Sequence, residues 1–316
     1  MTHRPGFLHR SASSRRRFYA LGGVLAAALL SSTGSSRAIG DPEARVTPIA
    51  DRFYVVSEPT ANMVLFIGED TSFVAGVQRP SLVSAAKAFV QSHNAPPVRY
   101  ALMLEDAGAL TLGDGGWGQA GSVTLAHEDF LRPMRRLARG KDPTTPATAM
   151  QHELPRVGFS QVVQLWLKDE EIHIIHERTG HTDADVIVHF EKAGVLCLGN
   201  TLTTDGYPAI ELARDGSLAG IIQTAGYFVR AFGKTPDRIE PIVPGRGPIA
   251  TTQDLRDYAD MLTAIRDRVQ SLIKDGKTVE DAVAAKPTAT FDDRWGHGPV
   301  TPDQFVAMVY QSLSKK

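Results

Sequence analysis

Residues 177–190, with the sequence ERTGHTDADVIVHF, have the residue types and spacing of a metal-binding or proton-transferring loop. His181 stands in a Gly-His-Thr turn and is followed by Asp183 and Asp185, before an alternating apolar segment. An imidazole in a loop beside the end of a strand can bind a transition metal or act as a general base. The two aspartates also fit a simpler role, as turn residues that orient the loop. His181 is therefore the first candidate for chemistry.

Other reactive side chains are expected to be structural. His173 and His176 are three positions apart in EIHIIHE, a spacing that directs them to opposite faces of a strand. We predict these two and His189 as sheet-surface or packed side chains rather than metal ligands. The single cysteine, Cys197, lies in the apolar segment GVLCLGN, which predicts a buried and unreactive thiol.

Two common catalytic motifs are absent from the sequence. It contains no Gly-x-Ser-x-Gly segment, which excludes the usual nucleophile elbow of a serine hydrolase. The glycine-rich segment GDGGWGQAG lacks the lysine of a phosphate-binding P-loop. The chemistry must therefore be sought among the histidines and carboxylates.

The apolar pattern predicts two groups of strands, each followed by helices. In the first half, strands are expected in RFYVVSE, NMVLFIGED, SFVAGV, VRYALMLE and SVTLAHEDF, with a helix over residues 80–94 and another in FLRPMRRLARG. After the Pro/Thr-rich segment KDPTTPATAM, strands are expected in SQVVQLWL, EIHIIHE, VIVHFEKAGVLCLG and RIEPIVPG, with a helix at residues 216–231. A long threonine-capped helix over residues 251–276 and the segments VEDAVAA and TPDQFVAMVYQSL complete the chain. This order predicts two sheets packed face to face with helices outside.

Four segments carry a resemblance to a known family: TGHTDADVIVHF, LGNTLTTDGYP, IVPGRGPIATTQDLRDYADML and AAKPTATFDDRWGHGPVTPDQFVAMVYQSL. In this order they resemble the metallo-β-lactamase superfamily, and more narrowly an exported bacterial branch of metallo-hydrolases, from about Val46 to Leu313. The resemblance implies an α/β (α+β) fold, the four-layer αββα metallo-β-lactamase sandwich, over residues 46–274. It also implies a C-terminal helical extension over residues 275–316, packed on that domain. In that superfamily one or two zinc ions at the sheet edges activate water for hydrolysis.

Most positions that hold zinc in that superfamily are substituted in this sequence. The His-x-His-x-Asp-His loop and the three later ligand positions align with Glu105, Ala107, Ala109, Leu110, His181, Asn200 and Arg246. Asp114 and Trp117 fall on the Asn and Phe that follow the first loop. Alanine and leucine have no donor atom, asparagine brings no charge, and arginine is a permanent cation that repels a dication. Of the seven ligands the resemblance implies, only His181 is retained.

We therefore predict a degenerate, metal-free relative that binds a ligand or partner in the former active-site cleft, with no cofactor. The candidate cleft residues are Glu105, His181, Asn200 and Arg246. Arg246 is expected either to reach into the cleft and pair with Glu105, Asp183 or Asp185, or to point to solvent. A cation in the cleft favours an anionic small molecule as the ligand, with a protein partner as the other class.

The alternative prediction is an active hydrolase that cleaves an ester, amide or lactam. It would use either a rebuilt single-zinc site, with His181 as ligand and Glu105 and Asn200 as weak ligands, or a metal-free site around Glu105 and His181. In the metal-free site, His181 would be the general base and Arg246 the oxyanion or carboxylate anchor.

The first forty residues predict a cleaved export signal. Ser14-Arg15-Arg16-Arg17-Phe18 resembles the twin-arginine motif, and the apolar stretch that follows is too short to span a bilayer comfortably. A general secretory signal with extra arginines is the alternative, and both predict a periplasmic or otherwise exported protein without a membrane anchor. The net charge of −1 and aromatic content of 7% do not favour nucleic acid as a partner.

Overall fold

The computed structural model describes residues 44–104, 114–138, 154–176, 179–232 and 241–315. Contacts divide the chain into Met1–Gly40 and Asp41–Lys316, and every described residue belongs to the second unit. The predicted export signal lies outside the described residues. The predictions for Glu105, Ala107, Ala109 and Leu110 also lie outside them.

Seven strands form the first sheet, and they lie side by side in chain order. They are β1 (Arg45–Ala50), β2 (Phe53–Glu58), β3 (Ala61–Ile67), β4 (Ser72–Gly76), β5 (Val98–Met103), β6 (Val123–His127) and β7 (Val157–Phe159). Strands β1 to β4 are antiparallel, as short turns allow, whereas β4 to β7 are parallel. Helix α1 (Pro80–Ser92) lies between β4 and β5 in the chain, and α2 (Glu128–Ala138) lies between β6 and β7.

Five strands form the second sheet, in the order β12-β11-β10-β9-β8. They are β8 (Val162–Trp166), β9 (Glu171–Ile175), β10 (Ile187–Phe190), β11 (Val195–Thr203) and β12 (Ile242–Arg246). The first four are antiparallel, and β12 pairs parallel with β11. Helix α4 (Leu218–Phe232) lies in the crossover between β11 and β12, as a parallel connection requires.

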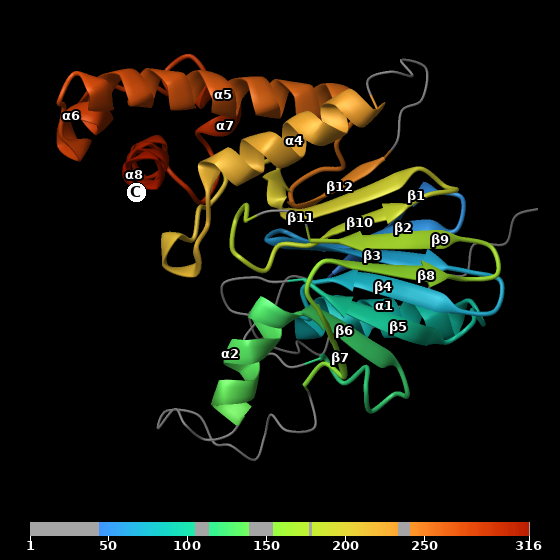
Figure 1. Ribbon diagram of the computed structural model, residues 1–316. Coiled ribbons are helices and arrows are strands. Elements are labelled where there is room, and N and C mark those ends of the chain that lie inside the picture. The colour runs from blue at the N-terminus through green and yellow to red at the C-terminus, as the bar shows by residue number, and fades with distance from the viewer. Residues whose placement is uncertain (1–43, 105–113, 139–153, 177–178, 233–240, 316) are drawn as a thin grey trace, which may run out of the picture. The chain divides into compact units, whose positions relative to one another are not determined.

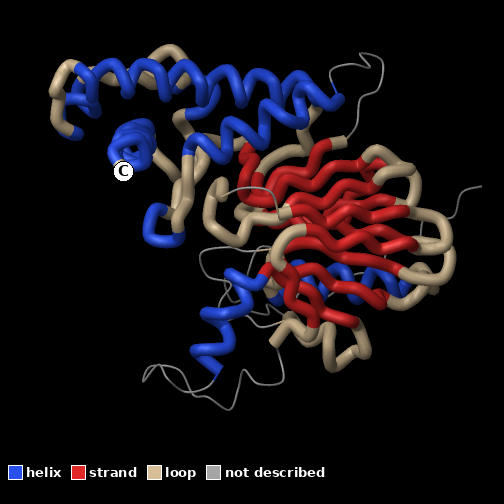
Figure 2. Tube along the Cα trace, in the orientation of Figure 1, coloured by secondary structure: helices blue, strands red, loops and turns tan. Residues whose placement is uncertain are grey.

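A buried apolar layer lies between the two sheets and draws side chains from both. Phe190 of β10 is its centre: its ring lies 4.8 Å from that of Phe53 and 5.7 Å from that of Phe73, both on the first sheet. Helix α1 covers the outer side of the first sheet, while α4 and α5 (Thr252–Lys274) cover β11 and β12 on the second. Figures 1 and 2 show the sheets stacked with helices outside. The predicted αββα sandwich is confirmed.

The C-terminal helices share one core with α4 and α5. They are α6 (Val279–Ala284), α7 (Asp292–Trp295) and α8 (Pro302–Ser314). Phe305 of α8 stacks on the fully buried Tyr207 with ring centroids 4.7 Å apart. Thr251 caps α5 in a capping box with Asp254, as the sequence predicts. Within the described residues, none of the helices is long and apolar enough to cross a membrane.

The boundary between β6 and α2 differs from the prediction. The sequence places His127 to Phe130 at the end of a strand, whereas the strand ends at His127 and the helix begins at Glu128. Two acidic residues, Glu128 and Asp129, open the helix, where they interact favourably with the positive end of its dipole. The apolar pattern identified the strand but did not resolve this helix start.

Candidate functional site

Three of the predicted site residues line one small cavity. His181 comes from the loop before β10, Asn200 from β11, and Arg246 from the end of β12. The cavity has a volume of about 130 Å³, and Thr60 and Thr203 also line it. The tertiary structure therefore brings together residues that are 65 positions apart, from 181 to 246, at one edge of the second sheet.

The loop that carries His181 is clamped against the start of α4. A Cβ atom on Gly220 would lie 1.5 Å from the carbonyl oxygen of Thr179, and one on Gly216 would lie 2.4 Å from that of His181. The amide of Glu211 donates to the same His181 carbonyl at 2.9 Å. Glycines at 216 and 220 therefore let the backbone at the start of α4 approach the His181 loop closely, which fixes the loop backbone.

His181 is almost fully buried and has a carboxylate beside it. Its side chain is 6% exposed, and its Nδ1 lies 3.6 Å from Oδ1 of the equally buried Asp185. The other oxygen of Asp185 accepts a hydrogen bond from the amide of Thr182 at 3.0 Å, which fixes the carboxylate. Asp185 thus has the loop-orienting role that the sequence predicts, and it lies within reach of the imidazole.

A Gly-Arg-Gly turn directs Arg246 into the cavity. Asn62, which is buried on β3, donates through Nδ2 to the carbonyl of Pro244, just before the turn, at 3.0 Å and to that of Gly247, its last residue, at 2.9 Å. A Cβ atom on Gly245 would lie 2.2 Å from Oδ1 of Asn200. The turn is therefore held from the first sheet and packs directly on the Asn200 side chain. The sequence analysis missed Asn62, because nothing local distinguishes it.

Among the described residues, the partner of Arg246 is Asp205 rather than Asp183 or Asp185. Its Nε lies 2.8 Å from Oδ1 of Asp205, and its Nη2 donates to Oγ1 of Thr203 at 3.1 Å. The side chain is 18% exposed, so it does not simply point to solvent. Pairing with Asp183 or Asp185 is wrong for the described residues, because Asp183 pairs with Arg214 instead.

The described residues do not fit the zinc centre that the family resemblance implies. A zinc site needs three or four imidazole, thiolate or carboxylate donors around one point. Here His181 shares the cavity with the uncharged Asn200 and with the guanidinium of Arg246. A permanent cation at a ligand position repels a dication and supplies no lone pair.

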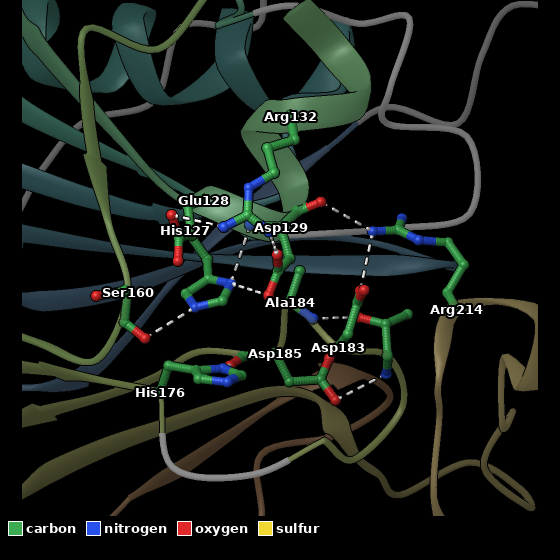
Figure 3. Close-up of polar contacts among 11 residues, drawn as sticks. His127, Glu128, Asp129, Arg132, Ser160, His176, Asp183, Ala184, Asp185 and Arg214 are labelled. Atoms are coloured by element: carbon green, nitrogen blue, oxygen red, sulfur yellow. Dashed lines mark hydrogen bonds and ion pairs between the residues drawn. The ribbon is translucent and has the colours of Figure 1, made fainter. Parts of the chain in front are cut away.

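A second polar cluster includes Asp183 and Asp185 from the loop that carries His181 (Figure 3). The rings of His127 and His176 stack with centroids 3.9 Å apart. His127 Nε2 lies 3.1 Å from the carbonyl of Ser160, and His176 Nδ1 donates to the carbonyl of Asp185 at 2.8 Å. His176 is thus a packed side chain, as predicted, and it contacts the loop that holds His181. The sequence analysis assigned no role to His127. Its position at the end of a strand was the one feature of the sequence that could have marked it as a candidate site residue.

Arg214 joins this cluster to the start of α2. Its Nη2 donates to the carbonyl of Asp129 at 3.4 Å and lies 3.2 Å from Oδ1 of Asp183 (Figure 3). Burial, and then the nearby charge of Asp129, raises the pKa of Asp183 above its usual range. Arg214 therefore offsets part of the repulsion between two carboxylates that lie close together.

The buried His127, stacked on His176, predicts an acid-sensitive stability. Burial, and then the neighbouring His176, lowers the pKa of His127 below the usual value of about 6.5. The unfolded chain then binds a proton at His127 more readily than the folded chain does. Stability should therefore be fully present above about pH 6.5 and fall as the pH drops below it. The melting temperature measured between pH 7.5 and 5.5 should decline less in His127→Gln than in the wild type.

The exposed His93→Gln variant is the control for this measurement, and its decline should match the wild type. An equal decline in His127→Gln would contradict the role given to His127.

Three other positions singled out in the sequence have structural roles. Asp114 is buried and accepts hydrogen bonds from the amides of Gly116 and Gly118 at 2.9 and 3.0 Å. Trp117 Nε1 donates to Gln78 at 2.7 Å. Cys197 is buried, as predicted, and burial raises the pKa of its thiol to about 11, which disfavours the reactive thiolate.

By sequence, the chain matches no protein-family model and no curated protein. By structure, it is similar to the DIM-1 metallo-β-lactamase, with 12% identity, a TM-score of 0.55 and coverage of 70% of this chain and 98% of that one. A metallo-β-lactamase from Pontibacter korlensis gives 13% identity, a TM-score of 0.53 and coverage of 70% and 99%. The inverting sec-alkylsulfatase Pisa1 from Pseudomonas sp. gives 14% identity and a TM-score of 0.62, over 85% of this chain and 50% of that one. With two stacked sheets, outer helices and these structural neighbours, the chain has the metallo-β-lactamase fold.

Proposed function

We propose that this protein binds a small anionic ligand in the cavity lined by His181, Asn200 and Arg246, and that it does so without zinc. The observation that carries the proposal is the position of Arg246, which lines this cavity from the place where the family pattern has its last histidine. A guanidinium there replaces the charge of a metal and attracts the same kind of group.

We also propose that the protein works outside the cytoplasm, after removal of an export signal within residues 1–40.

The groups around the cavity suit a compact anion. Asp205 and Thr203 engage Nε and Nη2 of Arg246, and among the described residues no contact uses Nη1. Charge-assisted hydrogen bonds from a guanidinium to a carboxylate, sulfate or phosphate group are among the stronger polar contacts in proteins. A volume of about 130 Å³ admits a group of that size, whereas drug-sized ligands occupy about 300–1000 Å³. The cavity is therefore expected to hold the charged end of its ligand.

Sulfate titration tests the proposal directly. A ligand that binds only the folded state raises its stability by about 1.4 kcal/mol at ten times its dissociation constant. We expect sodium sulfate to raise the melting temperature saturably in the low-millimolar range, relative to sodium chloride at equal ionic strength. Saturation separates site binding from the general stabilising effect of sulfate, which grows steadily with concentration. A rise that is linear in sulfate, or absent, would contradict the proposal for this probe.

Metal-free hydrolysis is the second candidate function, and the His181–Asp185 geometry favours it. A buried carboxylate 3.6 Å from the imidazole can orient a general base, and Arg246 lines the same cavity as an anchor for developing negative charge. Turnover of 4-nitrophenyl acetate by the metal-stripped wild type, with at least a hundredfold loss in His181→Gln, would favour this function over simple binding. Equal rates in both proteins would exclude His181 as the base.

A further inference from the structure

The outer face of the second sheet carries a row of polar side chains across three strands. Residues 172 and 174 of β9 and 188 and 190 of β10 point into the core between the sheets. Because strand residues alternate between faces, His173 and His189 point outward. They stand opposite each other across β9 and β10, and Gln164 of β8 stands opposite His173 on its other side. The two imidazoles are therefore neighbours on a rigid sheet, away from the cavity of His181.

Carboxylates complete this row. His189 Nδ1 lies 3.1 Å from Oε2 of Glu191, and His173 Nε2 lies 2.8 Å from Oε1 of Glu171. One ligand atom from each of His173, His189 and Glu191 can be chosen so that all three lie within 4.8 Å of one another. The histidine side chains are only 23% and 16% exposed, so they lose little further hydration on binding an ion.

We propose that His173, His189 and Glu191 form a binding site for a single divalent transition-metal ion of the zinc class. Donor atoms on a tetrahedral ion lie about 2.0–2.2 Å from it, and hence roughly 3.4 Å from one another. The half-exposed Glu191 side chain can close the remaining gap by a rotamer change, while the two strands hold the histidines in place.

The donor set selects the class of ion. Two imidazoles and one carboxylate suit zinc and copper, whereas calcium and magnesium require oxygen ligands throughout. Three protein ligands leave one coordination position for water or for a group from a second molecule. Glu171, hydrogen-bonded to His173, has the position of the carboxylate that commonly orients a metal-bound imidazole. The sequence analysis predicted these histidines as sheet-surface or packed side chains rather than metal ligands. They do lie on the sheet surface, and the proposed metal site rests on their alignment across the strands.

Zinc titration of the untagged full-length protein tests this inference. We expect one equivalent of zinc to bind in calorimetry and at least a tenfold loss of affinity in His173→Gln, His189→Gln and Glu191→Gln. His181→Gln, in the former metal centre, and the exposed His93→Gln should bind zinc as the wild type does. Copper electron paramagnetic resonance should report two nitrogen ligands in the wild type and one in either sheet-histidine variant. Circular dichroism of each variant checks that the fold is retained.

Three outcomes would overturn the inference. The first is no zinc binding by the wild type. The second is undiminished binding by His173→Gln and His189→Gln. The third is loss of binding in His181→Gln alone, which would place the ion in the cavity. That third result would also contradict the metal-free ligand cavity, whereas the first two leave the sulfate test unaffected.

Discussion

Replacing Gly220 by alanine is expected to lower the free energy of unfolding by about 3 kcal/mol, the upper end of the usual cost of overpacking. A methyl group there would lie 1.5 Å from the carbonyl oxygen of Thr179, which is backbone and cannot rotate away. Either α4 or the loop before His181 must move. Because α4 is also packed in the core with α5 and α8, we expect the loop to shift and His181 to leave its place beside Asp185.

Gly226→Ala is the matched control, because Gly226 lies in the same helix. A Cβ atom there would meet only the end of the flexible Arg230 side chain, at 3.2 Å. Alanine inside a helix is more favourable than glycine by about 0.5–1 kcal/mol, so this variant should be slightly stabilised. Urea unfolding of both variants measures the difference. Equal stabilities would show that α4 does not clamp the His181 loop.

Removing the cation of Arg246 is expected to abolish most of the binding in the cavity. In Arg246→Gln, the affinity for sulfate should fall about 10- to 100-fold, since a hydrogen bond to a charged group contributes about 1.5–3 kcal/mol. The free energy of unfolding should change by only about 1 kcal/mol. Asp205 is 31% exposed and keeps its hydrogen bond from Thr203, so it is not left buried without a partner.

Two further variants identify the cause of that loss. Arg246→Lys keeps the charge but cannot reach Asp205, Thr203 and an anion together, so it should bind sulfate with intermediate affinity. Arg99→Gln removes the same charge from an exposed position on β5 and should bind sulfate as the wild type does. If Arg99→Gln weakened binding as much as Arg246→Gln, the effect would be one of net charge, and the proposed site would be wrong.

The proposed replacement of a metal by Arg246 accounts for several features together. Arg246 needs Asp205 and Thr203 to hold its side chain, and it needs glycine at 245 because the backbone there lies against Asn200. Asn62 holds the turn from the opposite sheet. Because the guanidinium is part of the chain, its positive charge is always present in the cavity. A metal centre carries its charge only when a metal ion is bound.

Much of the fold follows from the sequence. Alternating apolar residues predict the strands, because each strand must bury one face between the sheets, and Phe190 illustrates this with its contacts to the facing sheet. The threonine at position 251 predicts the start of α5, because a local side-chain oxygen satisfies the first amides of a helix. These features depend on neighbours within a few residues, which a sequence contains directly.

The sequence by itself also determined which side chains can take part in chemistry: it placed His181, Asn200 and Arg246 as candidates, and the structure puts all three around one cavity. Only the tertiary structure decided their partners. Asp205 rather than Asp183 pairs with Arg246, and His173 meets His189 across two strands. Ion pairs and metal ligands depend on distances of a few ångströms between segments far apart in the chain. Such distances follow from strand register and loop path, which no local pattern specifies.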